Sequence, residues 1–205
     1  APSISDVVPS WGTYLNAAED NADGTIVVTT ADSANGATVT VTGMGVTDTC
    51  TVSSNACTVT VAAADLQSLT DGTTYTINVA LTADAAGNTA TSDTGDTFVY
   101  DITAPSISNV VPSWGTYLNA AEDNADGTIV VTTSGAEDGQ TVTVTGMGVT
   151  DTCSLSSDTC TVTVAAADLQ ALTDGTTYTI TVNVDDAAEN SATPDTGDTF
   201  VYDIT

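Results

Sequence analysis

Apolar and polar residues alternate with period two along several short segments of the chain. Thr38–Thr42 reads Thr-Val-Thr-Val-Thr, and Thr58–Val61 and Thr74–Val79 alternate in the same way. Such alternation over a few residues is typical of a strand with one buried and one solvent-exposed face. Threonine takes the exposed positions, where its β-branched side chain suits a pleated surface and adds no charge. The pattern therefore predicts an all-β chain.

In the first half of the chain, the alternating segments are separated by turn residues and predict seven short strands. That number of strands favours an immunoglobulin-like Greek-key β-sandwich. The segment Leu69-Thr-Asp-Gly-Thr-Thr-Tyr75 resembles a tyrosine corner, in which the Tyr hydroxyl bonds back to the preceding loop. One helical turn is expected within Ala62–Leu69. The expected strands are Ser3–Val8, Thr25–Thr30, Ala37–Thr42, Thr47–Val52, Ala56–Ala62, Thr74–Ala83 and Thr97–Ile102.

The second half of the chain repeats the first. Ala1-Pro-Ser-Ile-Ser returns at Ala104, and residues 7–30 return without a change as residues 110–133. A period near 100 residues is too long for a solenoid unit, so it indicates complete domains in series. We predict two tandem domains, residues 1–102 and 103–205, within a longer array. Ala1 begins no signal-peptide pattern, so an export signal is expected elsewhere.

The charge composition is extreme: 27 Asp and Glu accompany no Lys, no Arg and no His. No side-chain salt bridge can form, and phosphate groups find no cationic anchor, which argues against nucleic-acid partners. No apolar run reaches the roughly 18 residues of a membrane span, so no direct membrane insertion is expected. Without His, Lys or Arg the usual acid–base and anion-stabilising groups are missing. The sequence therefore predicts a protein that is not an enzyme.

Four cysteines fall as two equally spaced pairs, Cys50/Cys57 and Cys153/Cys160. This pattern predicts two disulfides and an oxidising compartment. Each pair flanks a short loop, so we expect its cysteines to face each other across adjacent strands of a hairpin. A redox switch is the alternative role for the pair. A zinc site is disfavoured, because the spacing is wide and no His is present.

Several segments resemble the bacterial immunoglobulin-like repeats of giant surface adhesins. The resemblance lies in Val99-Tyr-Asp-Ile-Thr-Ala-Pro105 between the copies, Leu15-Asn-Ala-Ala-Glu19, Ala63–Leu66 with Leu69–Gly72, and Asp84-Ala-Ala-Gly-Asn88. It covers essentially the whole chain. It implies secreted extender repeats that calcium holds in line at or near the domain junctions. The cysteine pairs and the absence of Lys, Arg and His depart from the family pattern.

Acidic side chains are concentrated in loops that a sandwich topology places at the two ends of a domain. Calcium takes about six to eight oxygen ligands with loose geometry, which converging loops could supply. Glu137 and Asp138 are expected in one of these loops. The alternative is an acidic, solvated surface without bound metal. The candidate calcium ligands are Glu19, Asp20, Asp23, Asp84, Asn88, Asp101, Glu122, Asp123, Asp126, Asp185, Asp186, Glu189, Asn190 and Asp203.

These observations predict a structural extender of a secreted, cell-surface adhesin or fibre, with calcium-stiffened junctions and neighbouring repeats as its partners. One alternative is a subunit that assembles with other copies into an extracellular filament, sheath or surface layer. Another alternative is a glycan-binding module that uses exposed Trp11 and Trp114. The competing interpretation of both Trp residues is packing at a sandwich edge or a domain contact.

Overall fold

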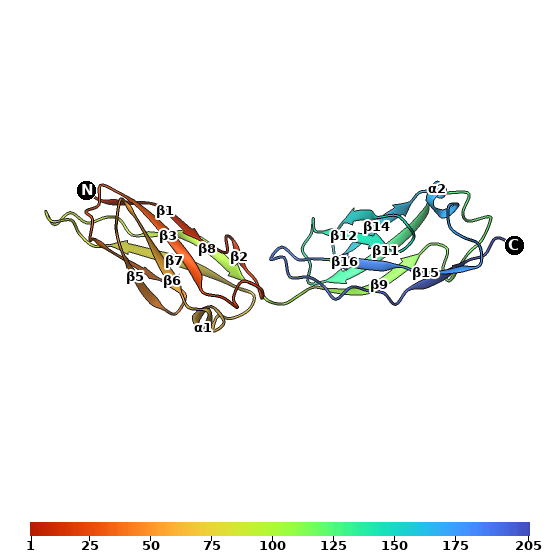
Figure 1. The fold of residues 1–205 in the computed structure, drawn as a ribbon, viewed down its shortest axis with the longest axis horizontal. Helices are drawn as coiled ribbons and strands as arrows, with labels where there is room; N and C mark the ends of the chain where they lie inside the picture. The colour runs from red at the N-terminus through yellow and green to blue at the C-terminus, as the bar shows by residue number, and fades with distance from the viewer. The chain divides into compact units, whose positions relative to one another are not determined.

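The computed structural model describes residues 1–205, which form two compact units, Ala1–Thr103 and Ala104–Thr205 (Figure 1). Each unit has its own hydrophobic core of buried Val, Ile, Leu and aromatic side chains. Because each core is closed within one unit, the two units are described separately.

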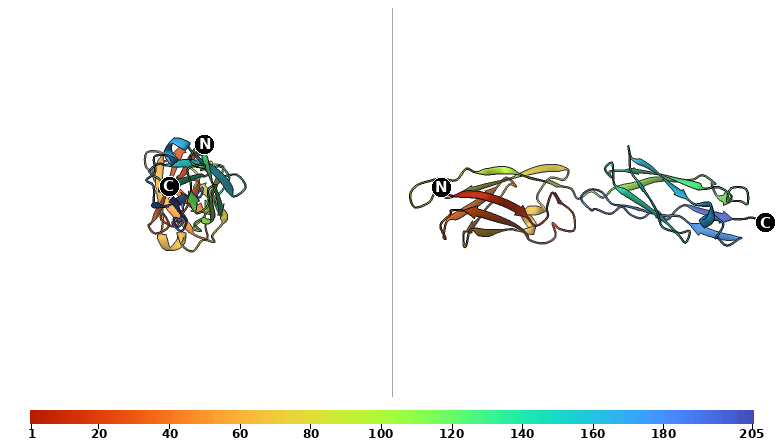
Figure 2. Two further views of the ribbon diagram at one scale, coloured as in Figure 1. Left: turned by 90° about the vertical axis from the view of Figure 1, so that its right-hand side faces the viewer. Right: turned by 90° about the horizontal axis from the view of Figure 1, so that it is seen from above.

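Unit 1 consists of two facing sheets (Figure 2). All neighbouring strands pair antiparallel except β2 and β8, which pair parallel. The first sheet has the order β1-β3-β6, with β1 Ser3–Pro9, β3 Gly24–Ala31 and β6 Ala56–Val61. The second has the order β2-β8-β7-β4-β5, with β2 Tyr14–Leu15, β8 Asp93–Tyr100, β7 Thr73–Leu81, β4 Thr38–Thr42 and β5 Thr47–Thr51.

Unit 2 repeats this arrangement, but its second sheet is in two pieces. The strand that corresponds to β7 is interrupted at Ile180, whose backbone N–H donates to the Asp198 carbonyl. The first sheet contains β9 Ser106–Pro112, β11 Gly127–Ser134 and β14 Thr159–Val164. One piece of the second sheet has the order β10-β17-β15, with β10 Tyr117–Leu118, β17 Thr199–Tyr202 and β15 Thr176–Thr179. The other piece has the order β13-β12-β16, with β13 Asp151–Ser154, β12 Thr141–Thr145 and β16 Thr181–Val184.

Burial along the strands follows the alternation in the sequence. In β4, Val39 and Val41 are fully buried, whereas the three Thr side chains face outward. The immunoglobulin-like β-sandwich predicted from this pattern is confirmed. The strand limits also agree within about two residues, except that β8 begins at Asp93 rather than Thr97. The two-residue strand β2 was not predicted, because so short a segment carries no periodic signal.

A single helical turn follows the third strand of the first sheet in each unit, as the sequence predicts. It spans Ala63–Leu66 (α1) in unit 1 and Ala166–Leu169 (α2) in unit 2. Leu66 and Leu169 are buried beneath these turns, so each turn closes one end of its core.

Both predicted disulfides are present, but they do not lie across a hairpin. Cys50 lies on β5, which pairs with β4, whereas Cys57 lies on β6, which pairs with β3. The disulfide therefore joins the two sheets. Between the cysteines, Ser54 and Asn55 both have positive φ, 52° and 63°. This tight reversal moves the chain from one sheet to the other, so the sequence-based expectation of adjacent paired strands was wrong.

We expect removal of one inter-sheet disulfide by Cys50→Ser and Cys57→Ser to destabilise unit 1. The bridge closes a short loop with a sequence separation of 7, for which a loss of about 2 kcal/mol in the free energy of unfolding is expected. Urea unfolding of the whole chain measures this loss. The Cys153→Ser, Cys160→Ser variant serves as the matched control, because it should affect unit 2 alone. An unchanged unfolding curve would contradict a stabilising role.

Candidate functional site

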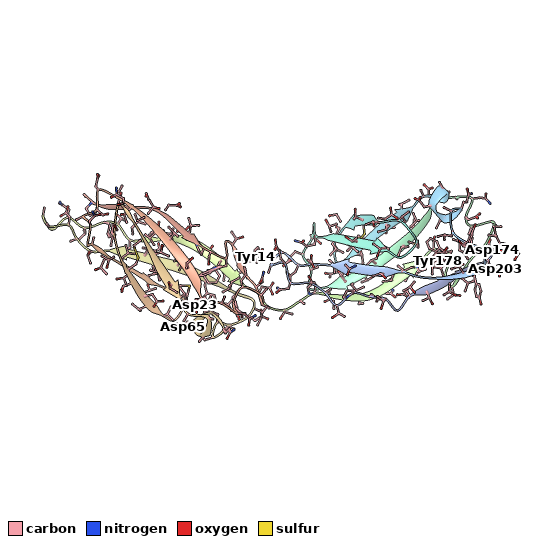
Figure 3. The ribbon with its side chains drawn as sticks, viewed as in Figure 1. Tyr14, Asp23, Asp65, Asp174, Tyr178 and Asp203 are labelled. Carbon is pink, nitrogen blue, oxygen red and sulfur yellow. A yellow bond between two sulfur atoms is a disulfide. The ribbon has the colours of Figure 1, made fainter.

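Half of the acidic residues of unit 1 lie at the end where β8 leaves the unit, which we call the exit end. It comprises the loop of residues 16–23, helix α1, the loop of residues 67–72 and residues 100–103. The corresponding exit end of unit 2 surrounds the end of β17, where Figure 3 labels Asp174, Tyr178 and Asp203.

Glu19 stabilises the beginning of its own loop. The Asn16 side-chain oxygen accepts the N–H groups of Ala18 at 2.9 Å and Glu19 at 3.0 Å, and the Glu19 carboxylate accepts the Asn16 N–H at 3.2 Å. This reciprocal arrangement is a capping box, which satisfies backbone donors at the start of a turn. In unit 2, the Glu122 carboxylate accepts the Asn119 N–H at 3.1 Å. The two Glu residues therefore have a structural role in their loops.

Asp20 is a buried carboxylate, 6% exposed. Its Oδ2 accepts a hydrogen bond from the Tyr100 hydroxyl at 2.7 Å, and Asp123 accepts the Tyr202 hydroxyl at the same distance. A buried charge is costly unless hydrogen bonds compensate its lost hydration. In a chain without side-chain cations, the neutral tyrosine hydroxyl supplies that compensation. The contact ties the loop of residues 16–23 to the last strand of its unit.

Asp23 caps the single turn of α1. Its Oδ1 accepts the Ala63 N–H at 3.0 Å, and Asp126 accepts the Ala166 N–H at the same distance. The first N–H groups of a helix have no partner within the helix, so a carboxylate is a suitable acceptor. Asp23 lies beside α1 in Figure 3. Asp23, a candidate metal ligand, therefore already accepts a hydrogen bond within its own unit.

Asp71 was missed as a site residue, although the sequence analysis had quoted its segment as a tyrosine corner. The corner is present, because Tyr75 accepts the Thr70 N–H at 2.9 Å and Tyr178 accepts the Thr173 N–H at 2.8 Å. Within this corner, the Asp71 carboxylate accepts two hydrogen bonds from the end of the unit. One comes from the Ile102 N–H at 2.8 Å and the other from the Thr103 hydroxyl. These hydrogen bonds, that of Thr103 first, lower the pKa of Asp71.

The last residues of each unit are thus fastened by several groups. Asp174 accepts the Ile204 N–H at 2.9 Å, as Asp71 does for Ile102. Asp101 accepts the Thr103 N–H through its carboxylate at 3.2 Å, and Asp203 accepts the Thr205 N–H at 3.3 Å. Asp101 and Asp203 were predicted as metal ligands, and both lie at the exit ends.

At the opposite end of each unit, an Asp organises the loop before the last strand. Asp84 accepts the N–H groups of Ala86 and Asn88, and the Asn88 side chain donates to its other oxygen at 2.8 Å. The Asn88 hydrogen bonds lower the pKa of Asp84. Asp186 and Asn190 repeat this contact in unit 2 and are buried. These predicted ligands therefore form hydrogen bonds with each other and with the backbone of their own loop.

Other acidic residues at this end of unit 2 also have local roles. Glu137 accepts the Ala187 N–H at 2.8 Å, which joins two loops, and Asp138 accepts the Ser157 N–H at 2.6 Å. Asp185 forms an isolated backbone bridge with Ser191. Glu189 occupies the left-handed region with φ 67°, the position that Gly87 holds in unit 1 with φ 82°.

The donor set within one unit does not fit a calcium ion. No group of three or more Asp, Glu, Cys or His side chains gathers on a common point. The carboxylates of Asp20, Asp23 and Asp84 each accept hydrogen bonds from their own unit. Calcium needs about six or more converging oxygens. A site at the domain junction, as expected from the sequence, stays a prediction.

Trp11 and Trp114 are core residues, each 6% exposed. The Trp11 ring meets Phe98 edge to face with centroids 5.3 Å apart, and Trp114 meets Phe200 at the same distance. Gly24 makes room for the indole, because a Cβ there would lie 2.4 Å from Trp11 Cζ3. The proposed glycan site required exposed Trp rings, so this part of the sequence-based prediction was wrong. Both Trp rings instead belong to the hydrophobic cores of their units.

Several carboxylates of the sandwich are partly buried, and one oxygen each of Asp48 and Asp151 is out of reach of solvent. Burial raises the pKa of Asp151 on β13, with a further contribution from nearby Asp168. Burial likewise raises the pKa of Asp96, near Asp93 and Asp6, and the pKa of Asp198, near Asp195. Inward-pointing charges on edge strands discourage pairing with strands of other chains. Asp48 and Asp151 lie on the edge strands β5 and β13 and suit that role.

Comparison with known proteins places this arrangement among adhesin domains. No protein-family model matches the chain, and no curated protein matches it. One similar structure is from a 1.5-MDa bacterial ice-binding adhesin and concerns retention at the host cell surface; it is 25% identical with a TM-score of 0.54. Another is from a Ca²⁺-stabilized adhesin that helps an Antarctic bacterium reach out and bind ice; it is 30% identical with a TM-score of 0.55.

These matches cover 100% and 98% of this chain. The chain resembles bacterial immunoglobulin-like adhesin repeats. The resemblance seen in the sequence is thereby confirmed. The chain spans 65% and 49% of the two solved adhesin chains, which is less than two thirds of either. None of its helices has the length and apolar character needed to cross a membrane.

The Asp–Tyr contacts predict a stability loss at alkaline pH. Burial and then the Asp20 hydrogen bond raise the pKa of Tyr100 from 10.0 to about 12, and the Asp123 hydrogen bond and then burial do so for Tyr202. A raised folded-state pKa gives stability that is complete below pH 10 and is lost as pH rises toward 12. The double variant Tyr100→Phe, Tyr202→Phe should have a lower free energy of unfolding than the native chain at neutral pH. Its free energy of unfolding should also fall less between pH 10 and 12.

Chemical unfolding at a series of pH values measures this difference. Tyr117→Phe is the control, because the Tyr117 side chain is 61% exposed and lies outside the core. An alkaline slope of the double variant equal to that of the native chain would contradict the assignment.

Proposed function

We propose that this chain is a spacer segment of a secreted, cell-surface adhesin or fibre. The observation that carries the proposal is the path of the chain through one unit. β2 and β8 run parallel, so the chain starts at one end of the unit and leaves at the other. A strand of seven to nine residues spans roughly 25–30 Å. Each added repeat therefore lengthens the array, and the partners of a unit are its neighbouring repeats.

The use of the acidic groups supports a non-enzymatic role. Asp20, Asp23 and Asp71 fasten loops and strand ends, and their contacts recur in both units. A repeated set of internal fasteners suits a structural purpose better than catalysis. The inter-sheet disulfides support an extracellular location, because disulfides persist in oxidising compartments. The likeness to solved adhesins supports the same location.

Calcium stabilisation of the array is the finer part of the proposal. It is supported by the chain's 27 acidic residues without any Lys, Arg or His, and by the similar adhesin that is Ca²⁺-stabilized. A divalent cation would reduce repulsion among these carboxylates. One unit lacks a complete ligand set, so the ligands would be drawn from the linker residue Asp101 and acidic loops.

The spacer function predicts that length grows in proportion to the number of units. Small-angle X-ray scattering of the present chain and of the same chain joined in tandem to a second copy measures the maximum dimension. We expect the tandem chain to be about twice as long, because every unit is left at the end opposite its start. A tandem chain that is hardly longer, or that associates side by side, would overturn the spacer function and favour a self-assembling filament.

Calcium binding predicts a higher melting temperature in calcium than in a chelator. Thermal unfolding monitored by circular dichroism, together with the scattering length, provides the measurement. Asp101→Asn should weaken the calcium effect, whereas Asp6→Asn, which removes the same charge from a residue of strand β1 outside the candidate set, should not. Melting temperature and length that are both indifferent to calcium would remove calcium from the proposal and leave the spacer function standing.

A further inference from the structure

One turn of unit 1 contains the only Asn of the chain that is followed by Gly, Asn35-Gly36. The Ala37 N–H donates to the Ala34 carbonyl at 3.1 Å, and Gly36 has φ 93°. A turn closed in this way, with Gly at positive φ in its third position, is a type II turn. Both Asn35 and Gly36 are exposed, so solvent water reaches the dipeptide.

Unit 2 has the same turn with a carboxylate in place of the amide. Asp138-Gly139 occupies the corresponding positions, and Gly139 has φ 95°. In unit 1, Asn35 Oδ1 accepts the Ser54 N–H at 2.9 Å. In unit 2, Asp138 Oδ1 accepts the Ser157 N–H at 2.6 Å. The turn therefore accommodates an amide and a carboxylate with the same contact.

An Asn that is followed by Gly can convert itself by intramolecular deamidation. The backbone nitrogen of Gly attacks the side-chain carbonyl carbon of Asn, and a new nitrogen–carbon bond forms while the bond from that carbon to the amide nitrogen breaks. Ammonia leaves with the proton that the backbone nitrogen gives up. Water then opens the resulting succinimide ring at one of its two carbonyl carbons and yields Asp or isoaspartate. Gly favours ring closure, because it has no side chain to crowd the attacking nitrogen.

The surroundings of Asn35 both assist and restrain this reaction. The Ser54 N–H at the side-chain oxygen stabilises the negative charge that develops on this oxygen during attack. The Gly36 N–H, however, donates to the Val52 carbonyl at 2.9 Å, so its nitrogen is not free to attack while the turn is closed. Exposed loops open locally at a low cost in free energy. The reaction therefore depends on the opening of one backbone contact.

We propose that Asn35-Gly36 is a self-modification site, at which opening of the turn lets unit 1 convert Asn35 to Asp or isoaspartate. The Asp product acquires the contact seen at Asp138, so unit 1 keeps its fold. Isoaspartate lengthens the main chain by one carbon before Gly36, which displaces the Gly36 N–H from the Val52 carbonyl and loosens the turn. The proposal goes beyond the spacer function and does not depend on it.

The test is incubation of the whole chain in warm, mildly alkaline buffer, followed by peptide mass spectrometry. Replacement of an amide by an acid gives a mass gain that fragmentation assigns to one residue. We expect conversion of Asn35 to be at least about tenfold faster than that of Asn190. Asn190 is followed by Ser, but it is only 7% exposed and its side chain donates to Asp186. No mass gain at Asn35 in the folded chain, while the urea-unfolded chain gains it, would overturn the proposal.

Two variants and one change of solvent test the contribution of the turn. Asp138→Asn places the same dipeptide in the turn of unit 2, so it should deamidate at a rate similar to that of Asn35. Asn35→Gln is the negative control, because its longer side chain has to close a larger ring, and it should remove the mass gain. Asn35 should react about tenfold faster in urea, where the contact of Gly36 with Val52 is lost. Equal rates with and without urea would refute control by the turn.

Urea unfolding of the two products tests the predicted consequences. Asn35→Asp, which reproduces one product, should be at least as stable as the native chain, because a carboxylate accepts the Ser54 N–H more strongly than an amide does. The purified isoaspartate form should be less stable. An isoaspartate form with native stability would contradict the role given to the Gly36 contact. None of these measurements involves the length of the chain, so failure of the spacer function would be recognised separately.

Discussion

The absence of side-chain cations governs the placement of the acidic groups in this protein. Each buried carboxylate must obtain its compensation from N–H and O–H donors, because no Lys, Arg or His exists to form an ion pair. The structure meets this constraint by using carboxylates as fasteners: Asp20 accepts a tyrosine hydroxyl, Asp23 caps a helical turn and Asp71 holds the end of the last strand. The same constraint leaves the outward strand positions to threonine.

These fasteners determine where the stability of a unit is concentrated. They gather at the exit end, where the chain would otherwise fray, because terminal segments have few neighbours. The opposite edge is secured differently, by a disulfide between strands of different sheets. The exit-end contacts and the disulfide thus hold different parts of a small sandwich with few aromatic side chains. Trp, Phe and Tyr rings pack against one another in its core. The same contacts and the same disulfide recur in both units.

The resemblance to adhesin repeats and the internal contacts support one account of the molecule. A spacer has to be long, soluble and resistant to extension, and none of these properties requires a catalytic group. The high negative charge favours solubility, and the two-sheet unit supplies length.

The sequence by itself determined the repeat, the strands and the tyrosine corner, because these depend on local periodicity and on short motifs. It also identified the acidic loops and predicted Asp20 and Asp23 as candidate metal ligands, but it did not indicate their hydrogen-bond partners Tyr100 and Ala63, which are 80 and 40 residues away. Only the tertiary structure decided those pairings, the placement of Cys50 and Cys57 on different sheets, and the burial of Trp11. The physical reason is that alternation specifies which face of a strand is buried, whereas contacts between distant segments depend on how the sheets pack.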